Sequence, residues 1–209
     1  DAGCRLSLAQ SICAVLLEIV PANSSAQLLH RDTFAPQLLP RRRALSAEFG
    51  CRAVEGEAGW RANFESDMMG TWRGVELTQP YLEKSDAGAI VVISTTAAVE
   101  AFAGASPYGA IKAGLLNYAS NLAQVLAGSG IRVNSVSPGP VYFEGGAWEQ
   151  IKTHMTDFYD ATIANIPMGR MGNNYEIADT VAFLASPRSA WTTGTNVVVD
   201  GGFTKRVQF

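Results

Sequence analysis

Long apolar runs are missing from this sequence, and histidine and cysteine are scarce in it. Among its 209 residues no uninterrupted apolar run reaches the length of about 18 that a membrane-spanning helix needs, so we expect no membrane segment. The chain has two histidines and three cysteines, the latter at Cys4, Cys13 and Cys51. An odd number of cysteines without metal-ligand spacing predicts neither a disulfide framework nor a metal site, and it fits a reducing cytoplasm.

Charge is sparse as well, because 17% of the residues are charged and the formal net charge is -3 at pH 7. Such a chain has no electrostatic reason to bind nucleic acid. Hydrophobic residues make up 47% of it, which suits one domain that buries a full core. The apolar stretch at residues 12–20 is interrupted by Glu18 and followed by Pro-Ala-Asn-Ser-Ser-Ala, a faint secretory pattern that we weigh below a cytoplasmic location.

The first 60 residues differ in composition from the rest of the chain. All three cysteines lie there, and no lysine occurs before Lys84. We interpret the arginine triplet at residues 41–43 as solvated surface rather than a phosphate site. Three origins are open for this segment: translation in a shifted reading frame, a diverged half-domain, or a separate module. Residues 8–20 favour a core helix or strand in each case, and the start at Asp1 leaves open that the sequence is a fragment.

From about residue 61 onward, helical and strand patterns alternate. Residues 89–93 form an apolar, β-branched run that predicts a buried strand, and apolar residues recur at helical spacing through residues 108–126. The other predicted elements are helices at residues 61–82 and 174–186 and strands at residues 131–136 and 196–199. This alternation predicts an α/β fold with a doubly wound, Rossmann-like parallel sheet, in which ligands bind at the carboxyl ends of the strands.

The chemistry that the sequence makes legible lies within residues 94–112. Ser94 and Thr95 follow the predicted strand, and Tyr108 and Lys112 lie four residues apart on the helix that comes next. That separation places two side chains on one helical face, so the ammonium can lie close to the phenol. A free tyrosine has a pKa near ~10, and a nearby cation favours the phenolate. The pair is therefore suited to general acid/base chemistry at neutral pH.

The order of these motifs resembles the short-chain dehydrogenase/reductase family, over about residues 63–209. The matching segments after Tyr-x-x-x-Lys are Ile-Arg-Val-Asn-Ser-Val-Ser-Pro-Gly at 131–139, Arg-Met-Gly at 170–172, Glu-Ile-Ala at 176–178, Phe-Leu-Ala-Ser at 183–186 and Thr-Gly-Thr-Asn-Val-Val-Val-Asp-Gly-Gly at 193–202. The resemblance implies an oxidoreductase that moves a hydride between NAD or NADP and a small carbonyl or secondary alcohol. It also implies a homodimer or homotetramer.

The resemblance assigns roles to individual residues. Tyr108 would be the acid/base, and Lys112 would tune it and reach the nicotinamide ribose. Thr95 stands thirteen residues before Tyr108, where the family has its active-site serine. Because adjacent strand residues point to opposite faces, we favour Thr95 over Ser94 as the hydroxyl that orients the substrate. The residues that would border the nicotinamide are Pro138, Gly139 and, through its backbone, Val141.

Asp67 stands where the family has an asparagine that helps to hold the active-site lysine through water. Residues 67–71 read Asp-Met-Met-Gly-Thr, against a family pattern of Asn-x-x-Gly-Thr. A carboxylate next to Lys112 would pair with the ammonium and partly cancel its field at Tyr108. We therefore predict an alkaline-shifted pH optimum; the alternative is that Asp67 lies on a solvated helix face.

The sequence says less about the segment that would bind the substrate and about the half of the domain that would bind the cofactor. Residues 141–166 correspond to the family's substrate loop and lid, and we expect at least one of Tyr142, Phe143 and Trp148 to face the substrate. Neither a glycine-rich turn of the kind that lets the backbone approach a pyrophosphate nor an Asn-Asn-Ala-Gly segment is found, since Gly3 is isolated like Gly50.

Two functions follow from this contrast. The first is the oxidoreductase, with residues 61–209 as the catalytic and substrate-binding part of a single Rossmann-like domain and residues 1–60 as an atypical remnant of its dinucleotide-binding half. The alternative is a non-catalytic relative, or an oligomer subunit, that cannot bind dinucleotide because the glycine-rich loop is missing. The sequence does not decide between NAD and NADP, and it does not identify the substrate.

Overall fold

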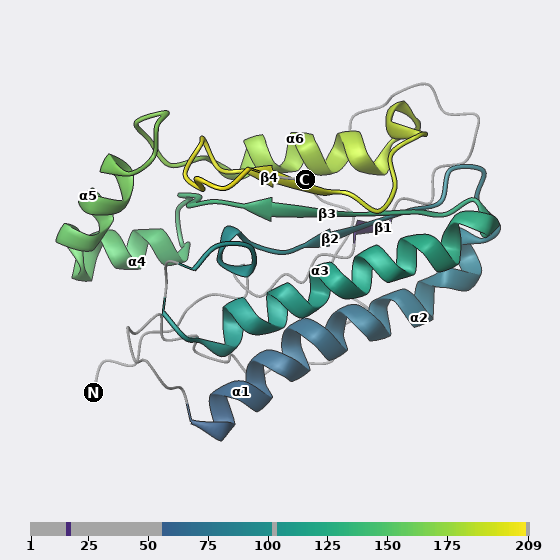
Figure 1. Ribbon diagram of the computed structural model, residues 1–209, viewed down its shortest axis with the longest axis horizontal. Coiled ribbons are helices and arrows are strands. Elements are labelled where there is room, and N and C mark those ends of the chain that lie inside the picture. Colours follow the sequence, from purple (N-terminus) through teal and green to yellow (C-terminus); the bar gives the residue numbers. More distant parts are fainter. Residues whose placement is uncertain (1–15, 18–55, 102–103, 208–209) are drawn as a thin grey trace.

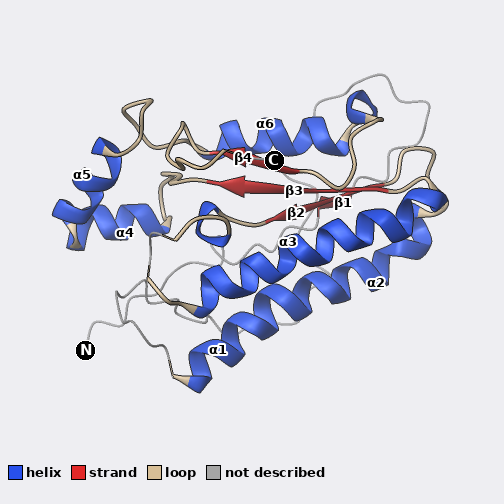
Figure 2. Cartoon of the chain, in the orientation of Figure 1, coloured by secondary structure: helices blue, strands red, loops and turns tan. Residues whose placement is uncertain are grey.

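The structure is a computed structural model that describes residues 16–17, 56–101 and 104–207. In these residues a sheet lies between helices on its two faces (Figures 1 and 2). The strands follow one another across the sheet in sequence order and span Leu16–Leu17 (β1), Ala89–Ile93 (β2), Arg132–Pro138 (β3) and Asn196–Val199 (β4).

The pairing of β2, β3 and β4 is parallel. Val91 lies opposite Asn134, and Ser135 lies opposite Asn196. Because the three strands run in one direction, their carboxyl ends meet at the same edge of the sheet. This confirms the predicted doubly wound α/β fold. The two-residue strand β1 pairs antiparallel with β2, so the described sheet is mixed at the edge that β1 forms.

The helices form two layers and a separate group at one end (Figure 1). One face of the sheet is covered by α6, the other by α2 and α3, and α4 and α5 lie beyond the carboxyl end of β3. No helix in the described ranges is both long and apolar enough to cross a membrane. The α-helices span Glu57–Asn63 (α1), Gly70–Leu82 (α2), Pro107–Leu126 (α3), Ala147–His154 (α4), Thr156–Ala164 (α5) and Asn174–Ala185 (α6).

Local sequence signals set the starts of two helices that carry the site. Before α3, the Ser106 hydroxyl accepts a hydrogen bond from the Gly109 N–H, and Pro107 occupies the first helical position, where its missing N–H costs no bond. α6 begins with a capping box, in which Asn173 and Glu176 exchange side chain to backbone bonds. The helix predicted over residues 108–126 is thus confirmed, with its start one residue earlier.

The long helix predicted at residues 61–82 starts earlier and is not uniform. It begins at α1 and passes through a π-helical segment, Phe64–Met69 (η2), before it continues as α2. A π-helical turn contains an extra residue, so it shifts the faces of the flanking helices relative to each other. Shorter 3₁₀ turns are Thr96–Ala98 (η3), Ala127–Ser129 (η4) and Pro187–Ser189 (η5).

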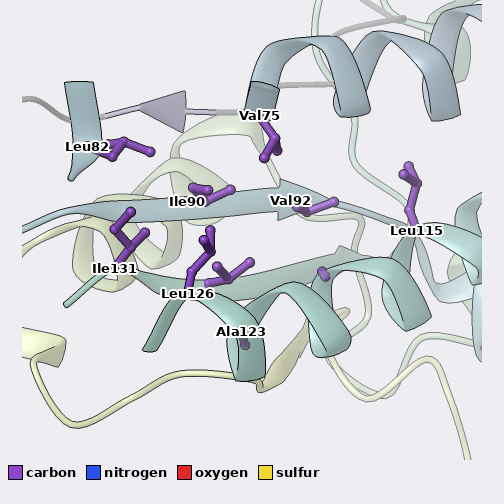
Figure 3. Packing of buried hydrophobic residues seen from close by; sticks show 10 residues of the cluster. Val75, Leu82, Ile90, Val92, Leu115, Ala123, Leu126 and Ile131 are labelled. Atoms are coloured by element: carbon purple, nitrogen blue, oxygen red, sulfur yellow. The ribbon is translucent and has the colours of Figure 1, made fainter. Parts of the chain in front are cut away.

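The core lies on both faces of β2, which explains its continuous apolar sequence. Ile90 and Val92 belong to a cluster with α2, α3 and β3 (Figure 3). Val91 belongs to a second cluster, with α6. The buried members of the first cluster are Val75, Leu82, Ile90, Val92, Leu115, Ala119, Ala123, Leu126, Ile131 and Val133. Burial of one large aliphatic side chain contributes about 1.5 to 3 kcal/mol, so this cluster holds α2 and α3 firmly against the strands.

One arginine ties α6 to the sheet. The Arg132 guanidinium donates to the carbonyl oxygens of Leu184 at 2.7 Å, Ser186 at 3.1 Å and Ala185 at 3.2 Å, at the carboxyl end of α6. These carbonyls have no partner within the helix, and a cation beside them also interacts favourably with the helix dipole. Burial lowers the pKa of Arg132. The hydrogen bonds of Arg132 therefore fix α6 relative to β3.

Candidate active site

A buried ion pair joins the π-helical segment to α3. Lys112 Nζ lies 3.5 Å from Asp67 Oδ1, and each residue is only 5% exposed. Asp67 is the buried residue of η2, so the extra residue of the π-turn directs this carboxylate towards α3. The Thr71 hydroxyl, one turn later, donates to the Asp67 carbonyl oxygen at 2.7 Å.

The Lys112 ammonium contacts two more elements. Nζ donates to the carbonyl oxygen of Ile93, the last residue of β2, at 3.1 Å, and lies 5.9 Å from the centroid of the Tyr108 ring. Tyr108 is half-buried near the start of α3. The ammonium is therefore held at the carboxyl end of the sheet between a carboxylate, a carbonyl and a phenol ring.

The two hydroxyl residues after β2 are used differently. Ser94 is 3% exposed; its hydroxyl donates to the Lys112 carbonyl oxygen at 3.1 Å, and its N–H donates to the Val136 carbonyl oxygen at 2.7 Å. Thr95 caps η3, because its hydroxyl accepts from the Ala97 N–H at 3.3 Å. A hydroxyl that accepts one bond still has its own proton to donate. Ser94 is thus engaged with the α3 backbone, and the Thr95 proton is not used by that cap.

A close backbone approach brings the two parts of the site together. A Cβ atom placed on Gly109 would lie 2.9 Å from the Ala97 carbonyl oxygen, which is closer than real contacts of this kind. The absence of a side chain at Gly109 therefore lets the start of α3, with Tyr108, approach the turn that holds Thr95. This role of Gly109 could not be predicted from the sequence, because Ala97 and Gly109 meet only in the folded chain.

Pro138, Gly139 and Val141 lie at the carboxyl end of β3 or just beyond it. A Cβ on Gly139 would lie 2.5 Å from Asp200 Cβ, so only glycine fits there. Val141 forms an isolated parallel bridge with Gly172, made by the Tyr142 N–H and the Pro140 carbonyl. In such a bridge the N–H and C=O of Val141 itself point away from Gly172.

An ion pair holds the segment that bridges to Val141. Arg170 donates to Glu176 Oε1 at 2.7 Å and to Oε2 at 3.0 Å, and Glu176 Oε2 also accepts from the Asn173 N–H at 2.8 Å. The hydrogen bonds from the Arg170 guanidinium and the Asn173 N–H lower the pKa of Glu176 to about 2. The same pair raises the pKa of Arg170.

Aromatic side chains pack against one another within residues 141–166, the segment for which the resemblance predicted a substrate loop and lid. The Trp148 and Phe158 rings stack, with their centroids 5.9 Å apart and an angle of 9° between their planes. The Tyr142 and Tyr159 rings meet edge to face, with their centroids 6.3 Å apart. Lys152 Nζ lies 5.5 Å from the Tyr142 ring and 5.7 Å from the Tyr159 ring. These contacts join α4 to α5, and sequence inspection missed Lys152 because a cation–π contact depends on the fold.

Phe143 contacts the start of α4. A Cβ on Gly146 would lie 3.0 Å from the Phe143 ring, so this ring packs over the backbone there. All three aromatic residues that were expected to contact the substrate, Tyr142, Phe143 and Trp148, therefore have partners within residues 141–166. That one of them also faces the substrate stays a prediction.

The predictions made for the first 60 residues fall mostly outside the described part of the chain. Leu16 and Leu17 form a strand, in the region where a core helix or strand was expected. The cysteines and the arginine triplet are outside the described residues. Within residues 16–17, 56–101 and 104–207, no group of three or more His, Cys, Asp or Glu side chains could hold a metal ion.

Comparison with known proteins identifies relatives of this arrangement. A protein-family model described as enoyl-(acyl carrier protein) reductase matches residues 50–204. The chain is similar to an isoepoxydon dehydrogenase of Aspergillus clavatus, with 39% identity over 158 residues that cover 75% of this chain and 61% of the relative. The chain thus spans about three fifths of that relative's length.

Solved structures agree with the sequence comparison. One is a short-chain oxidoreductase of Pseudomonas aeruginosa with NADPH bound and an atypical catalytic centre, which has a TM-score of 0.66 and 27% identity over 75% of this chain and 61% of that one. Another is described as a short-chain dehydrogenase/reductase family protein, with a TM-score of 0.61 and 35% identity over 71% of this chain and 60% of that one.

Proposed function

Because the chain belongs to the short-chain dehydrogenase/reductase family, we propose that the whole protein is an oxidoreductase that transfers a hydride between NAD or NADP and a small carbonyl or secondary alcohol. The observation that carries the proposal is the buried Lys112 ammonium beside the Tyr108 ring at the carboxyl edge of the sheet. Ligands of doubly wound sheets bind at that edge.

Tyr108 is the proposed acid/base. Reduction of a carbonyl requires a proton for the developing alkoxide, and oxidation of an alcohol requires its removal, so one positioned phenol serves both directions. Lys112 supplies the positive charge that favours the phenolate, and its buried position strengthens that field relative to water. The nicotinamide dinucleotide, when bound, supplies or takes the hydride.

The Thr95 hydroxyl is the proposed hydrogen-bond donor to the substrate oxygen. Its proton is not used by the bond to Ala97, whereas the Ser94 proton is donated to the Lys112 carbonyl oxygen. This supports Thr95 over Ser94 as donor to the substrate oxygen. Ser94 then acts as a positioning residue that fastens the end of β2 to the helix of the acid/base.

Asp67 reduces the effect of the Lys112 positive charge on its surroundings. At 3.5 Å its carboxylate partly cancels the field of Lys112 at Tyr108. The proposal therefore keeps the expected alkaline shift of the pH optimum. It also gives Asp67 a structural task, because a buried ammonium without a counter-charge is costly.

The described residues fit the nicotinamide end of a dinucleotide. Lys112 and Tyr108 lie at the carboxyl edge, and Pro138, Gly139 and Val141 border the same edge. The outward-pointing N–H and C=O of Val141 suit a carboxamide, which carries both a donor and an acceptor. The pyrophosphate end would fall to residues 1–60, and this division of one Rossmann-like domain into residues 1–60 and 61–209 is part of the proposal.

The proposal also includes a cytoplasmic homodimer or homotetramer. Its support is the set of large apolar side chains that α1, η2 and α2 leave exposed. Exposed apolar surface of this kind marks interaction sites. These side chains are Trp60, Phe64, Trp72, Leu77 and Tyr81.

Titration of the purified protein with NADH and with NADPH tests the proposal. Saturable thermal stabilisation by either cofactor, together with cofactor-dependent reduction of a carbonyl panel that Tyr108→Phe abolishes, is the expected result. No stabilisation at millimolar concentrations of both cofactors would contradict it and would return the non-catalytic relative as the better description.

A further inference from the structure

A cavity of about 520 Å³ opens between α3, β3, β4 and the C-terminal segment. None of the residues proposed for hydride transfer lines it. Cavities of this size are typical of small-molecule sites. Its lining consists of Leu116, Ala119, Ser120, Val133, Ser135, Thr193, Gly194, Thr195, Asn196 and Arg206.

Ser135 is an unpaired hydroxyl in this lining. It is 2% exposed, and within the described residues its hydroxyl makes no hydrogen bond, although its N–H donates to the Thr195 carbonyl oxygen at 2.8 Å. A buried hydroxyl that lacks a partner costs free energy, so such a group usually has a ligand or water to bind. Ser135 lies in the middle of β3, opposite Asn196.

The lining offers more donors than acceptors. The Asn196 side-chain oxygen already accepts from the Ser137 hydroxyl at 2.8 Å, so its amide NH₂ is what it has left to offer. The Thr193 hydroxyl accepts from the Val133 N–H at 3.0 Å and donates to the Val133 carbonyl oxygen at 3.5 Å, so it offers the ligand no proton. Among the described lining residues, Arg206 carries the one charge, and no carboxylate opposes it. This inventory favours an anionic ligand with oxygen acceptors.

Arg206 is placed at the cavity by the C-terminal segment. The Lys205 N–H donates to Glu100 Oε2 at 3.0 Å, and the Thr204 N–H and hydroxyl donate to Asp200 Oδ2 at 2.8 and 2.7 Å. These bonds fix Thr204 and Lys205 to the rest of the fold, so the guanidinium of the next residue, Arg206, is held at the cavity.

We propose that this cavity binds a small aliphatic carboxylate. The carboxylate pairs with Arg206 and accepts from the hydroxyl and amide donors, while the hydrocarbon part lies on the apolar wall formed by Leu116, Ala119 and Val133. Inorganic phosphate has the charge but not the apolar body, so it binds more weakly. The site is independent of the proposed hydride-transfer residues.

Isothermal titration calorimetry with hexanoate tests the proposal, with inorganic phosphate as the second probe. We expect one saturable hexanoate site per chain, with affinity reduced about tenfold or more by Arg206→Gln and by Ser135→Ala. Arg188→Gln, which removes an exposed arginine outside the cavity, is the matched control and should not change the affinity. Ser135→Ala should leave the melting temperature unchanged, because the hydroxyl it removes is unpaired.

Three results would overturn the proposal. The first is the absence of saturable heat at hexanoate concentrations up to about 10 mM, which covers the range of dissociation constants of weak small-ligand sites. The second is binding that Arg206→Gln and Ser135→Ala leave unchanged. The third is hexanoate binding that Tyr108→Phe or saturating NADH abolishes, because that would place the ligand at the hydride-transfer site.

Discussion

Lys112 and Asp67 form an ion pair in which neither partner has appreciable access to water, with Nζ and Oδ1 separated by 3.5 Å. The partners come from η2 and α3, which also pack against each other through the side chain of Met68 at Gly114. The pair thus links the fold of the helix layer to the electrostatics at Tyr108, and substitutions should separate the two effects.

Asp67→Asn should move the midpoint of the pH–rate profile to lower pH. The reason is that the field of Lys112 at Tyr108 is no longer partly cancelled, so the phenolate forms more readily in either reaction direction. Measuring kcat/KM from pH 6 to 10 tests this, with the exposed Asp86→Asn as a control that should leave the profile in place. Coincident profiles for wild type and Asp67→Asn would remove Asp67 from the mechanism.

Lys112→Met should destabilise the fold by about 3 to 5 kcal/mol, because it leaves the Asp67 carboxylate buried without its cation. Adding Asp67→Asn to this variant should recover much of the loss. Urea unfolding of the two single variants and the double variant measures the coupling. Additive single effects would mean that the two side chains do not stabilise each other.

Thr95→Ala and Ser94→Ala should fail in different ways. Thr95→Ala should lower kcat about 100-fold, because a donor to the reacting oxygen is lost, whereas its effect on stability should be limited to the loss of the 3.3 Å cap bond from the Ala97 N–H. Ser94→Ala should cost about 1 kcal/mol of stability, because a buried hydrogen bond to the Lys112 carbonyl is lost. Thr95→Ser should retain most activity. A larger kcat loss in Ser94→Ala than in Thr95→Ala would reverse the assignment.

Gly109→Ala should lower kcat more than it raises KM for the cofactor. The new Cβ would meet the Ala97 carbonyl oxygen at 2.9 Å and push Tyr108 away from Thr95. Gly128→Ala is the matched control, because a Cβ there meets nothing within 4 Å. Steady-state kinetics and melting temperatures of both variants separate misplacement of Tyr108 from general loss of stability.

Glu176→Gln should make the protein less stable at neutral pH, with a difference that disappears in acid. The folded-state pKa is lowered from 4.5 to about 2, so the contribution of the carboxylate is present above pH 4.5 and is lost as pH falls through about 2. Unfolding curves of wild type and variant should therefore converge over that interval. Glu144→Gln, in the loop before α4, serves as the control.

The parts of the fold that depend on local patterns could be predicted from the sequence. The apolar run of β2 and the helical spacing of α3 predicted both elements, and from them the meeting of Tyr108 and Lys112 at the edge of the sheet. The π-helical form of η2 could not be predicted, because apolar spacing does not distinguish one extra residue within a helix. The approach of Gly109 to Ala97 and the position of Lys152 between two tyrosines depend on packing between distant segments.

The π-helical segment also makes the site sensitive to the number of residues in the chain. Successive residues of an α-helix are rotated by about 100° from one another. Deleting a single residue from Phe64–Met69 would allow a regular α-helix through this segment and would turn everything before the deletion by that angle relative to α2. The counter-ion of Lys112 is therefore specified by chain length as well as by residue type, because a deletion between Asp67 and α2 would turn the carboxylate away from α3.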